Sequence, residues 1–152
     1  MCGIAGIAGP ADPRVVEAMT RALAHRGPDG TGVVCPVGEG FGLGHRRLAI
    51  IDRSPAGAQP MADPAGRYWI TYNGEVYNFR ELRADLAKRG RAFRPGTDTE
   101  VVLAAYETWG PACLQRFNGM LAFAIWDGHR RELFMARVVE NGLKSVKKER
   151  QG

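Results

Sequence analysis

The stretch MLAFAIWD at residues 120–127, followed after a short GHRR segment by ELFMAR at residues 132–137, decides the class of fold. Both runs are rich in the apolar, branched and aromatic side chains that favour strands. The turn at Gly128-His129 is too short for a parallel crossover, which needs about a dozen residues or more. The stretch therefore predicts a β-hairpin within an antiparallel sheet.

Further strand and helix signals lie on the amino-terminal side of this hairpin. Strands are expected at residues 2–9, 32–35, 40–52 and 67–73. Helical spacing occurs in three sets of apolar residues: Val15, Val16, Met19 and Leu23; Phe79, Leu82 and Leu86; and Val101, Val102, Ala105 and Tyr106. Because strands and helices do not alternate strictly, we expect an α+β fold in which helices cover the faces of antiparallel sheets.

Composition bounds the class of protein. The chain has 152 residues, enough for one domain with a real core, and its 45% hydrophobic and 24% charged residues are ordinary for a globular protein in water. Its start lacks the basic segment and cleavage site of a secretory signal, and no apolar stretch approaches the roughly 18 residues of a membrane helix. We therefore expect a cytoplasmic protein with no membrane partner.

The net charge of +5 does not predict a nucleic-acid partner. Residues 137–152 hold five basic and two acidic side chains and so account for +3 of it, and no nucleic-acid motif occurs. GEGFGLG at residues 38–44 fits no phosphate-binding fingerprint and indicates close backbone packing in a strand. The cysteines and histidines are too dispersed for a disulfide framework or a metal site: Cys2, Cys35, Cys113, His25, His45 and His129.

Cys2 stands directly behind the initiator methionine, beside a glycine. Once Met1 is removed, the thiol shares its residue with a free α-amino group, whose ordinary pKa of about 7.7 to 8.0 suits a general base. A terminal cysteine with this built-in base needs no histidine or aspartate partner to act as a nucleophile. The other interpretation, an incidental buried thiol, stays open on these residues alone.

A second candidate lies in TYNGEVYN at residues 71–78. Asn73-Gly74 is the best short-range signal for a hairpin turn. A helical pattern, rather than a convincing partner strand, follows it, and this weakens the interpretation as a turn. An amide side chain beside an unobstructed glycine N–H also suits an oxyanion hole, where each donor contributes about 2.7–4 kcal/mol in acyl transfer.

GHRRLAI at residues 44–50 and GTDTE at residues 96–100 supply charges of opposite sign. In a strand, Arg46 and Arg47 point to opposite faces, so one stays in solvent while the other reaches a pocket and grips a carboxylate through two parallel hydrogen bonds. Asp98 either caps the helix that follows or binds an ammonium group. An arginine for a carboxylate and an aspartate for an ammonium together describe the head group of an amino acid.

Seven motifs, in this order, resemble the glutaminase domain of glutamine-hydrolysing asparagine synthetases. They are MCGIAGI (1–7), HRGPDG (25–30), GHRRLAI (44–50), GAQPM (57–61), YNGEVYN (72–78), GTDTE (96–100) and FNGMLAFAIWD (117–127). That domain is a class II glutamine amidotransferase, one of the N-terminal nucleophile hydrolases. The similarity runs from residue 2 to about residue 137, so we expect a domain over residues 1–137 and a divergent, frayed basic tail over residues 138–152.

The resemblance implies a four-layer αββα sandwich, with two antiparallel sheets between helical layers, and it implies an enzymatic reaction. The thiol of Cys2 is expected to attack the side-chain carboxamide of L-glutamine while the terminal amine moves the proton. The side chain of Asn73 and the N–H of Gly74 are expected to hold the oxyanion. Ammonia is then expected to leave as a γ-glutamyl thioester forms, and attack by water on the thioester to release glutamate.

The same resemblance assigns the binding of glutamine. Arg47 is expected to bind its α-carboxylate, and Asp98 together with the region of Glu75 its amino group, beside Asn73 and Gly74. The other residues expected to line the pocket are Leu48, Ala49, Ile50 and Ile51.

The family pattern stops after Ala136-Arg137, where an expected aspartate is absent, and Ser145 stands where a proline is expected. No Ser-Gly-Gly-x-Asp-Ser loop occurs, so ATP and magnesium are expected only for a synthetase domain that this sequence lacks, and we expect no cofactor here. We expect a glutaminase that supplies ammonia to a separate ATP-dependent synthetase. Two alternatives stay open: a non-catalytic glutamine-binding or regulatory module, and a truncated, inactive remnant that is missing its last strands and exposes a sheet edge.

Overall fold

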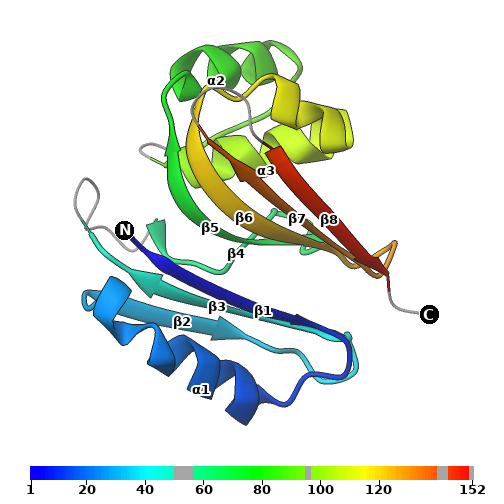
Figure 1. Cartoon of the computed structure of the whole chain (residues 1–152). Coiled ribbons are helices and arrows are strands. Elements are labelled where there is room, and N and C mark those ends of the chain that lie inside the picture. Colours follow the sequence, from blue (N-terminus) through cyan, green and yellow to red (C-terminus); the bar gives the residue numbers. More distant parts are fainter. Residues whose placement is uncertain (50–56, 95–96, 140–143, 151–152) are drawn as a thin grey trace.

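The computed structural model describes residues 1–49, 57–94, 97–139 and 144–150, and it contains two antiparallel sheets. The smaller sheet has the order β1-β3-β2, with β1 at Gly3–Ala8, β3 at Phe41–Arg47 and β2 at Gly30–Val34. The larger has the order β4-β5-β6-β7-β8, with bounds Met61–Ala62, Tyr68–Val76, Gly119–Asp127, Glu132–Val138 and Lys144–Arg150. The two sheets face one another (Figure 1).

Helices cover the two outer faces. Helix α1 (Pro13–Ala22) lies on the smaller sheet, and α2 (Phe79–Lys88) and α3 (Asp98–Trp109) lie on the larger one (Figure 1). Two short 3₁₀ helices, Ala24–Arg26 and Gly110–Gln115, follow α1 and α3. The layer order is therefore helix, sheet, sheet, helix, which confirms the predicted α+β class and the αββα sandwich.

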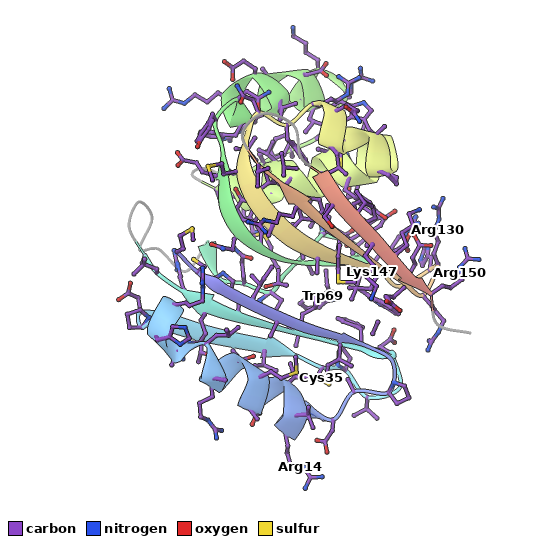
Figure 2. All side chains as sticks on the ribbon, viewed as in Figure 1. Arg14, Cys35, Trp69, Arg130, Lys147 and Arg150 are labelled. Atoms are coloured by element: carbon purple, nitrogen blue, oxygen red, sulfur yellow. The ribbon has the colours of Figure 1, made fainter. Side chains whose placement is uncertain are left out.

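Strand alternation divides the apolar residues of the larger sheet between two cores. Leu121, Phe123 and Ile125 of β6 point to one face and pack in the core beneath α2 and α3. Ala124 and Trp126, on the other face of β6, pack between the sheets, where the rings of Trp126 and Phe41 stack with centroids 4.9 Å apart. The side chain of Trp69 also points into the space between the sheets (Figure 2).

The glycines of GEGFGLG allow α1 to lie close to β3. A Cβ atom built on Gly44 would lie 1.9 Å from Oγ1 of Thr20, which is an impossible contact. The expectation of close backbone packing is therefore confirmed. The helical spacing of the apolar residues at 15–23 predicted the helix but not which of them are buried. Val16 is fully buried, whereas Val15 and Met19 are exposed.

Two strands differ in length from their sequence signals. The strand expected at residues 40–52 ends at Arg47. Its pairing with the neighbouring strands ends there too, because Gly3, the first residue of β1, lies opposite Arg46 and Gly30, the first residue of β2, lies opposite Arg47. The strand expected at residues 67–73 continues to Val76, paired with β6 throughout. Asn73-Gly74 therefore lies inside β5, and the interpretation as a hairpin turn was wrong.

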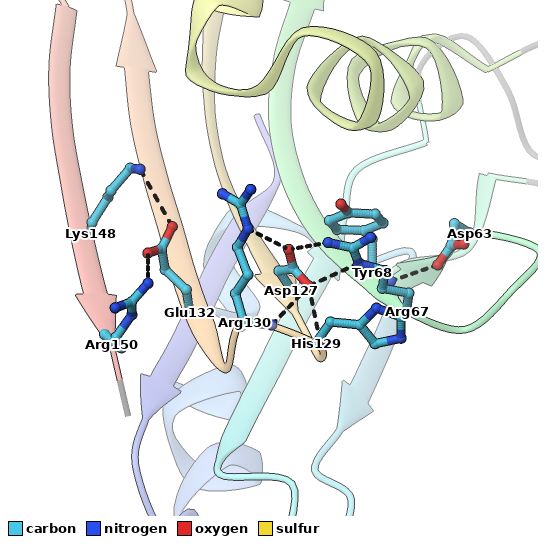
Figure 3. A network of polar contacts seen from close by, with 9 residues as sticks. All are labelled: Asp63, Arg67, Tyr68, Asp127, His129, Arg130, Glu132, Lys148 and Arg150. Carbon is cyan, nitrogen blue, oxygen red and sulfur yellow. Dashed lines mark hydrogen bonds and ion pairs between the residues drawn. The ribbon is translucent and has the colours of Figure 1, made fainter. Parts of the chain in front are cut away.

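The expectation of a frayed tail was also wrong for residues 144–150. These residues form β8 and pair with the whole of β7, from Glu132 opposite Arg150 to Val138 opposite Lys144. The carboxylate of Glu132, nearly buried, forms ion pairs with Lys148 at 3.5 Å and Arg150 at 4.0 Å (Figure 3). The charges that made this segment resemble a solvated tail thus contact a carboxylate of the sheet. The domain boundary after residue 137 stays a prediction.

Candidate functional site

A pocket of about 520 Å³ lies where the start of β1, the end of β3, the second half of β5 and the start of α3 meet. Seven of the ten residues predicted for the site line it: Cys2, Arg47, Leu48, Asn73, Gly74, Glu75 and Asp98. Ala49 does not line it, and Ile50 and Ile51 lie outside the described residues. Most of the residues predicted from the sequence therefore line one cavity, although they are spread over nearly a hundred positions of the chain.

Cys2 is a free, half-buried thiol just before β1. The backbone N–H of Leu48 donates a hydrogen bond to its Sγ at 3.4 Å, and the thiol contacts the Leu48 carbonyl at 3.9 Å. From the other side, Nε of Arg26 donates to the Cys2 carbonyl at 3.3 Å. These contacts hold both the backbone and the sulfur of Cys2 at the wall of the pocket.

The segment after β3 is fixed by a carboxylate from the HRGPDG motif. Oδ2 of Asp29 accepts a hydrogen bond from the Ala49 N–H at 2.8 Å, and the Asp29 N–H donates to the Arg47 carbonyl at 3.0 Å. Ala49 therefore acts through the backbone, which explains its place outside the lining. Asp29 in turn keeps Leu48 facing the thiol of Cys2.

Arg46 and Arg47 leave β3 in different directions, as strand alternation requires. Arg47 follows Phe41 and Leu43 on the face that looks toward the larger sheet, and it lines the pocket. Nε of Arg46 donates to the Gly27 carbonyl at 2.9 Å, so this residue is tied to a loop and does not extend freely into solvent.

Gly74 can be no other residue. Its φ of +147° is rare for residues with a side chain, and a Cβ atom there would lie 2.3 Å from the carbonyl oxygen of Met120 on β6. In an antiparallel strand, alternate N–H groups point to the same edge. Tyr72 and Val76 lie two residues before and two residues after Gly74. Their N–H groups point away from β6, since that of Tyr72 donates to Gln59 and that of Val76 to Asp98. The Gly74 N–H therefore points toward the same open edge, at the pocket.

Asp98 is the first residue of α3, but it does not cap the helix. The capping residue is Thr97, whose hydroxyl accepts a hydrogen bond from the Thr99 N–H at 3.1 Å, so the interpretation of Asp98 as a cap was wrong. Oδ2 of Asp98 instead accepts from the Tyr72 hydroxyl at 2.6 Å and from the Val76 N–H at 3.4 Å. Burial, reinforced by the charge of Asp98, raises the pKa of Tyr72 far above its ordinary value, so the hydroxyl remains a donor.

Two residues that shape this wall, Gln59 and Tyr72, were not predicted from the sequence. Oε1 of Gln59 accepts from the Tyr72 N–H at 2.6 Å, and its Nε2 donates to Oγ1 of Thr99 at 3.3 Å. Gln59 lies in the motif GAQPM, which marked the position without indicating a role. Tyr72 precedes Asn73 in YNGEVYN, and its contact with Asp98 joins positions 26 residues apart, which no local pattern reveals.

The other two cysteines lie away from the pocket. Cys113 is fully buried, and burial raises its pKa to about 12. The thiol of Cys35 donates to the Ala11 carbonyl at 3.5 Å, and burial likewise raises its pKa. Within the described ranges, no three His, Cys, Asp or Glu side chains converge as metal ligands. None of the helices in that part of the chain is long and apolar enough to span a membrane.

Comparisons with solved structures identify the fold. Glutamine phosphoribosylpyrophosphate amidotransferase from Bacillus subtilis, in complex with ADP and GMP, superposes with a TM-score of 0.74. The match covers 90% of this chain and 37% of that one, at 23% sequence identity. A structure described as the allosteric regulatory enzyme of purine biosynthesis matches with a TM-score of 0.76, also at 23% identity.

Comparisons of sequence identify the family. Asparagine synthetase (glutamine-hydrolysing) 3 of Bacillus subtilis is 42% identical over 145 residues, which cover 90% of this chain and 23% of the relative. A putative asparagine synthetase of Mycobacterium bovis is 41% identical over 155 residues, with 24% of its length covered. The chain thus spans about a quarter of these relatives. The family model described as a glutamine amidotransferase domain matches residues 1–141. The chain therefore belongs to the glutamine amidotransferase domain family.

Proposed function

We propose that this chain is a glutaminase that hydrolyses the side-chain amide of L-glutamine to glutamate and ammonia, with Cys2 as the nucleophile. One observation carries the proposal: a single pocket brings together a free thiol, a glycine N–H at an open strand edge, an arginine and a partly satisfied carboxylate. Acyl transfer needs a nucleophile and an oxyanion site, and recognition of an amino acid needs the two charges.

Binding of glutamine follows from the placement of the charges. Arg47 approaches from the smaller sheet and offers a planar guanidinium for the α-carboxylate. Asp98 approaches from the start of α3, and the two hydrogen bonds that its carboxylate accepts from described residues both engage Oδ2. The carboxylate can therefore accept an ammonium group while it remains anchored by Tyr72. Glu75, on the same face of β5 as Asn73, adds negative charge at the exposed rim.

The chemistry begins with the removal of Met1. Met1 lines the pocket and is 75% exposed, so an aminopeptidase can reach the terminus. Removal converts the Cys2 amide nitrogen into a free amine, which takes the thiol proton as sulfur attacks the carboxamide carbon. The amide of Asn73 and the N–H of Gly74 stabilise the oxyanion that forms.

Collapse of the tetrahedral intermediate completes the first half of the reaction. The C–N bond breaks, the amine returns its proton to the leaving nitrogen, and ammonia departs from a γ-glutamyl thioester. Water, deprotonated by the same amine, then attacks the thioester carbon and breaks the C–S bond. The net reaction is glutamine plus water to glutamate plus ammonia, and no cofactor takes part.

The ammonia acceptor is proposed from the relatives. Their names describe glutamine-hydrolysing asparagine synthetases, and this chain matches only about a quarter of their length. We propose that ammonia passes to an ATP-dependent synthetase, which holds the ATP and magnesium. The three free cysteines suit a reducing compartment, so the cytoplasm is the proposed location.

The test is the release of glutamate from glutamine by the purified, untagged chain, compared with the Cys2→Ala variant. We expect turnover in the original chain and none in the variant, because no other thiol lines the described part of the pocket. Binding of glutamine by Cys2→Ala, measured by calorimetry, should persist because Arg47 and Asp98 are unchanged. Equal turnover in both proteins would move the nucleophile elsewhere.

A further inference from the structure

Gln59 lines the pocket, but the proposed mechanism gives it no role. The protein binds its side-chain amide on both sides. Oε1 accepts a hydrogen bond from the Tyr72 N–H on β5 at 2.6 Å, and Nε2 donates to Oγ1 of Thr99 on α3 at 3.3 Å. Tyr72 and Thr99 are each only 3% exposed. Gln59 therefore connects the strand that carries Gly74 to the helix that begins at Asp98.

The register of β4 shows which position Gln59 occupies. In the described chain, β4 begins at Met61, which lies opposite Ile70 of β5 in an antiparallel pair. If the same register continued toward the amino terminus of β4, residue 59 would lie opposite Tyr72. Its backbone carbonyl would then accept a hydrogen bond from the Tyr72 N–H, which points away from β6.

The backbone of Gln59 turns to the other sheet instead. Its carbonyl oxygen lies so close to Gly32 of β2 that a Cβ atom at this glycine would have no room. The Tyr72 N–H therefore meets the side-chain carbonyl of Gln59 where a continued strand would have supplied a backbone carbonyl. One residue thus contacts the smaller sheet through its backbone and the larger sheet through its amide.

This exchange of backbone for side chain decides which N–H groups of β5 stay open. A continued β4 would place the backbone of residue 57 opposite Gly74, and its carbonyl would occupy the Gly74 N–H. In the fold as it is, side chains bind the two flanking N–H groups, that of Tyr72 through Gln59 at 2.6 Å and that of Val76 through Asp98 at 3.4 Å. The Gly74 N–H between them points to the pocket.

We propose that Gln59 is a positioning residue: its amide anchors β5 at Tyr72 in place of a backbone strand, and so fixes the proposed oxyanion donors Asn73 and Gly74 while the Gly74 N–H stays open. This inference rests on the proposed function. A directional hydrogen bond to the Tyr72 N–H restrains the backbone that leads directly into the two donors. Oxyanion donors act only when they lie about 2.7–3.1 Å from the developing charge. Displacement of reacting groups by about 1 Å costs on the order of a hundredfold in rate.

The test is Gln59→Met, which keeps the length of the side chain and removes both of its hydrogen-bonding groups. We expect kcat for glutamine hydrolysis to fall by about tenfold or more, because the proposed donors lose their anchor. KM should stay within about threefold of the original, since Arg47 and Asp98 are unchanged. An unchanged kcat would overturn the proposal. A rise in KM with kcat unchanged would also overturn it, because Gln59 would then bind the substrate directly.

Asn78→Leu is the matched control. The Asn78 amide also joins two backbone groups: it accepts from the Asn118 N–H at 2.9 Å and donates to the Arg116 carbonyl at 2.9 Å. It is not among the described residues that line the pocket. Asn78→Leu should therefore lose stability in urea but keep kcat within about threefold of the original. Equal losses of kcat in Asn78→Leu and Gln59→Met would overturn the proposal.

A further variant covers a failure to fold. If Gln59→Met does not fold, Thr99→Val replaces it, because it releases the Gln59 amide from α3 and nearly keeps the shape of the side chain. We expect kcat to fall by about fivefold or more at unchanged KM, and an unchanged kcat would overturn the proposal. If the original chain hydrolyses no glutamine, the proposed function fails and this inference fails with it. Equal hydrolysis by the original chain and the variant overturns the inference alone.

Discussion

The strand pair β5 and β6 carries a polar cluster at each end, and the two clusters differ in what their hydrogen-bonding groups face. At one end, Gly74 and Asp98 direct donors and acceptors at a pocket. At the other end, Asp127 accepts from both Nε and an Nη of Arg67, at 3.0 and 2.8 Å, and from the backbone N–H groups of His129 and Arg130 (Figure 3).

The second cluster also borders a cavity, of about 390 Å³, yet both arginines that line it are already paired with carboxylates. Arg67 is bound by Asp127, and Arg91 forms an ion pair with Glu107. A hollow lined by charged residues is therefore not by itself a site. The pocket at Cys2 differs in that the Gly74 N–H points to its open edge and the carboxylate of Asp98, anchored by Tyr72, lines it.

The largest expected effect comes from blocking the amine at the functional end. A chain that retains Met1, or carries an amino-terminal tag, should release no glutamate, because an amide nitrogen cannot serve as the base. Glutamate release is measured on tagged and cleaved preparations of the same protein, with a carboxyl-terminal tag as the control. Full activity with a blocked amine would refute the role of the amine.

Replacing Asn73 by alanine should lower kcat by about 10² to 10³-fold, because one of the two proposed oxyanion donors is lost. The stability of the variant should change little, since Asn73 is only half-buried at the pocket. Steady-state kinetics and urea unfolding are measured together. A kcat near that of the original chain would leave Asn73 as a structural residue of β5.

At the opposite end the effect should fall on stability instead of catalysis. Asp127→Asn should lower the free energy of unfolding by about 2–3 kcal/mol, because hydrogen bonds to a buried carboxylate are replaced by weaker or mismatched ones. The kcat of the folded variant should stay within about twofold. A variant that loses activity but keeps its stability would erase the contrast between the two ends.

The ionisation of Asp127 should also make the stability of the fold depend on pH. We expect this effect to be smaller than the loss of stability in Asp127→Asn. Burial opposes ionisation of Asp127, but the hydrogen bonds from Arg67 and from the Arg130 and His129 N–H groups outweigh it and hold the pKa below its ordinary value. A depressed pKa stabilises the fold above the unfolded value of about 3.9, and that contribution is lost as the pH falls through the folded value. The difference between the urea midpoints at pH 6 and pH 3.5 should therefore be smaller for Asp127→Asn than for the original chain. Parallel curves would contradict this assignment.

The smallest effect is expected from Cys35→Ser. This thiol hydrogen-bonds a carbonyl outside the pocket, and a hydroxyl can replace it as the donor. Glutamate release should match that of the original chain within error, while reaction with a thiol reagent loses one equivalent at most. A large kinetic loss would reveal a role for Cys35 that its position does not suggest.

The sequence predicted which residues share a pocket better than it predicted the strand ends. Period-two patterns and a short turn indicated the β6–β7 hairpin, because both cores bury alternate residues of these strands. Asn73-Gly74 resembles a turn locally, and only pairing with β6 shows that the chain continues through it. Strand β8 was missed because its cations pair with Glu132, a contact that no local pattern contains. The role of Gln59 likewise depends on Tyr72, which another element brings beside it.

The most direct measurement is the intact mass of the untagged, folded protein before and after exposure to a diazo-ketone analogue of glutamine. The geometry predicts a chain that lacks Met1 and gains one adduct, mapped to Cys2 by peptide sequencing and suppressed by excess glutamine. No adduct on a Met-free, folded chain, or an adduct on Cys35 instead, would contradict the claim that the pocket presents Cys2 to glutamine.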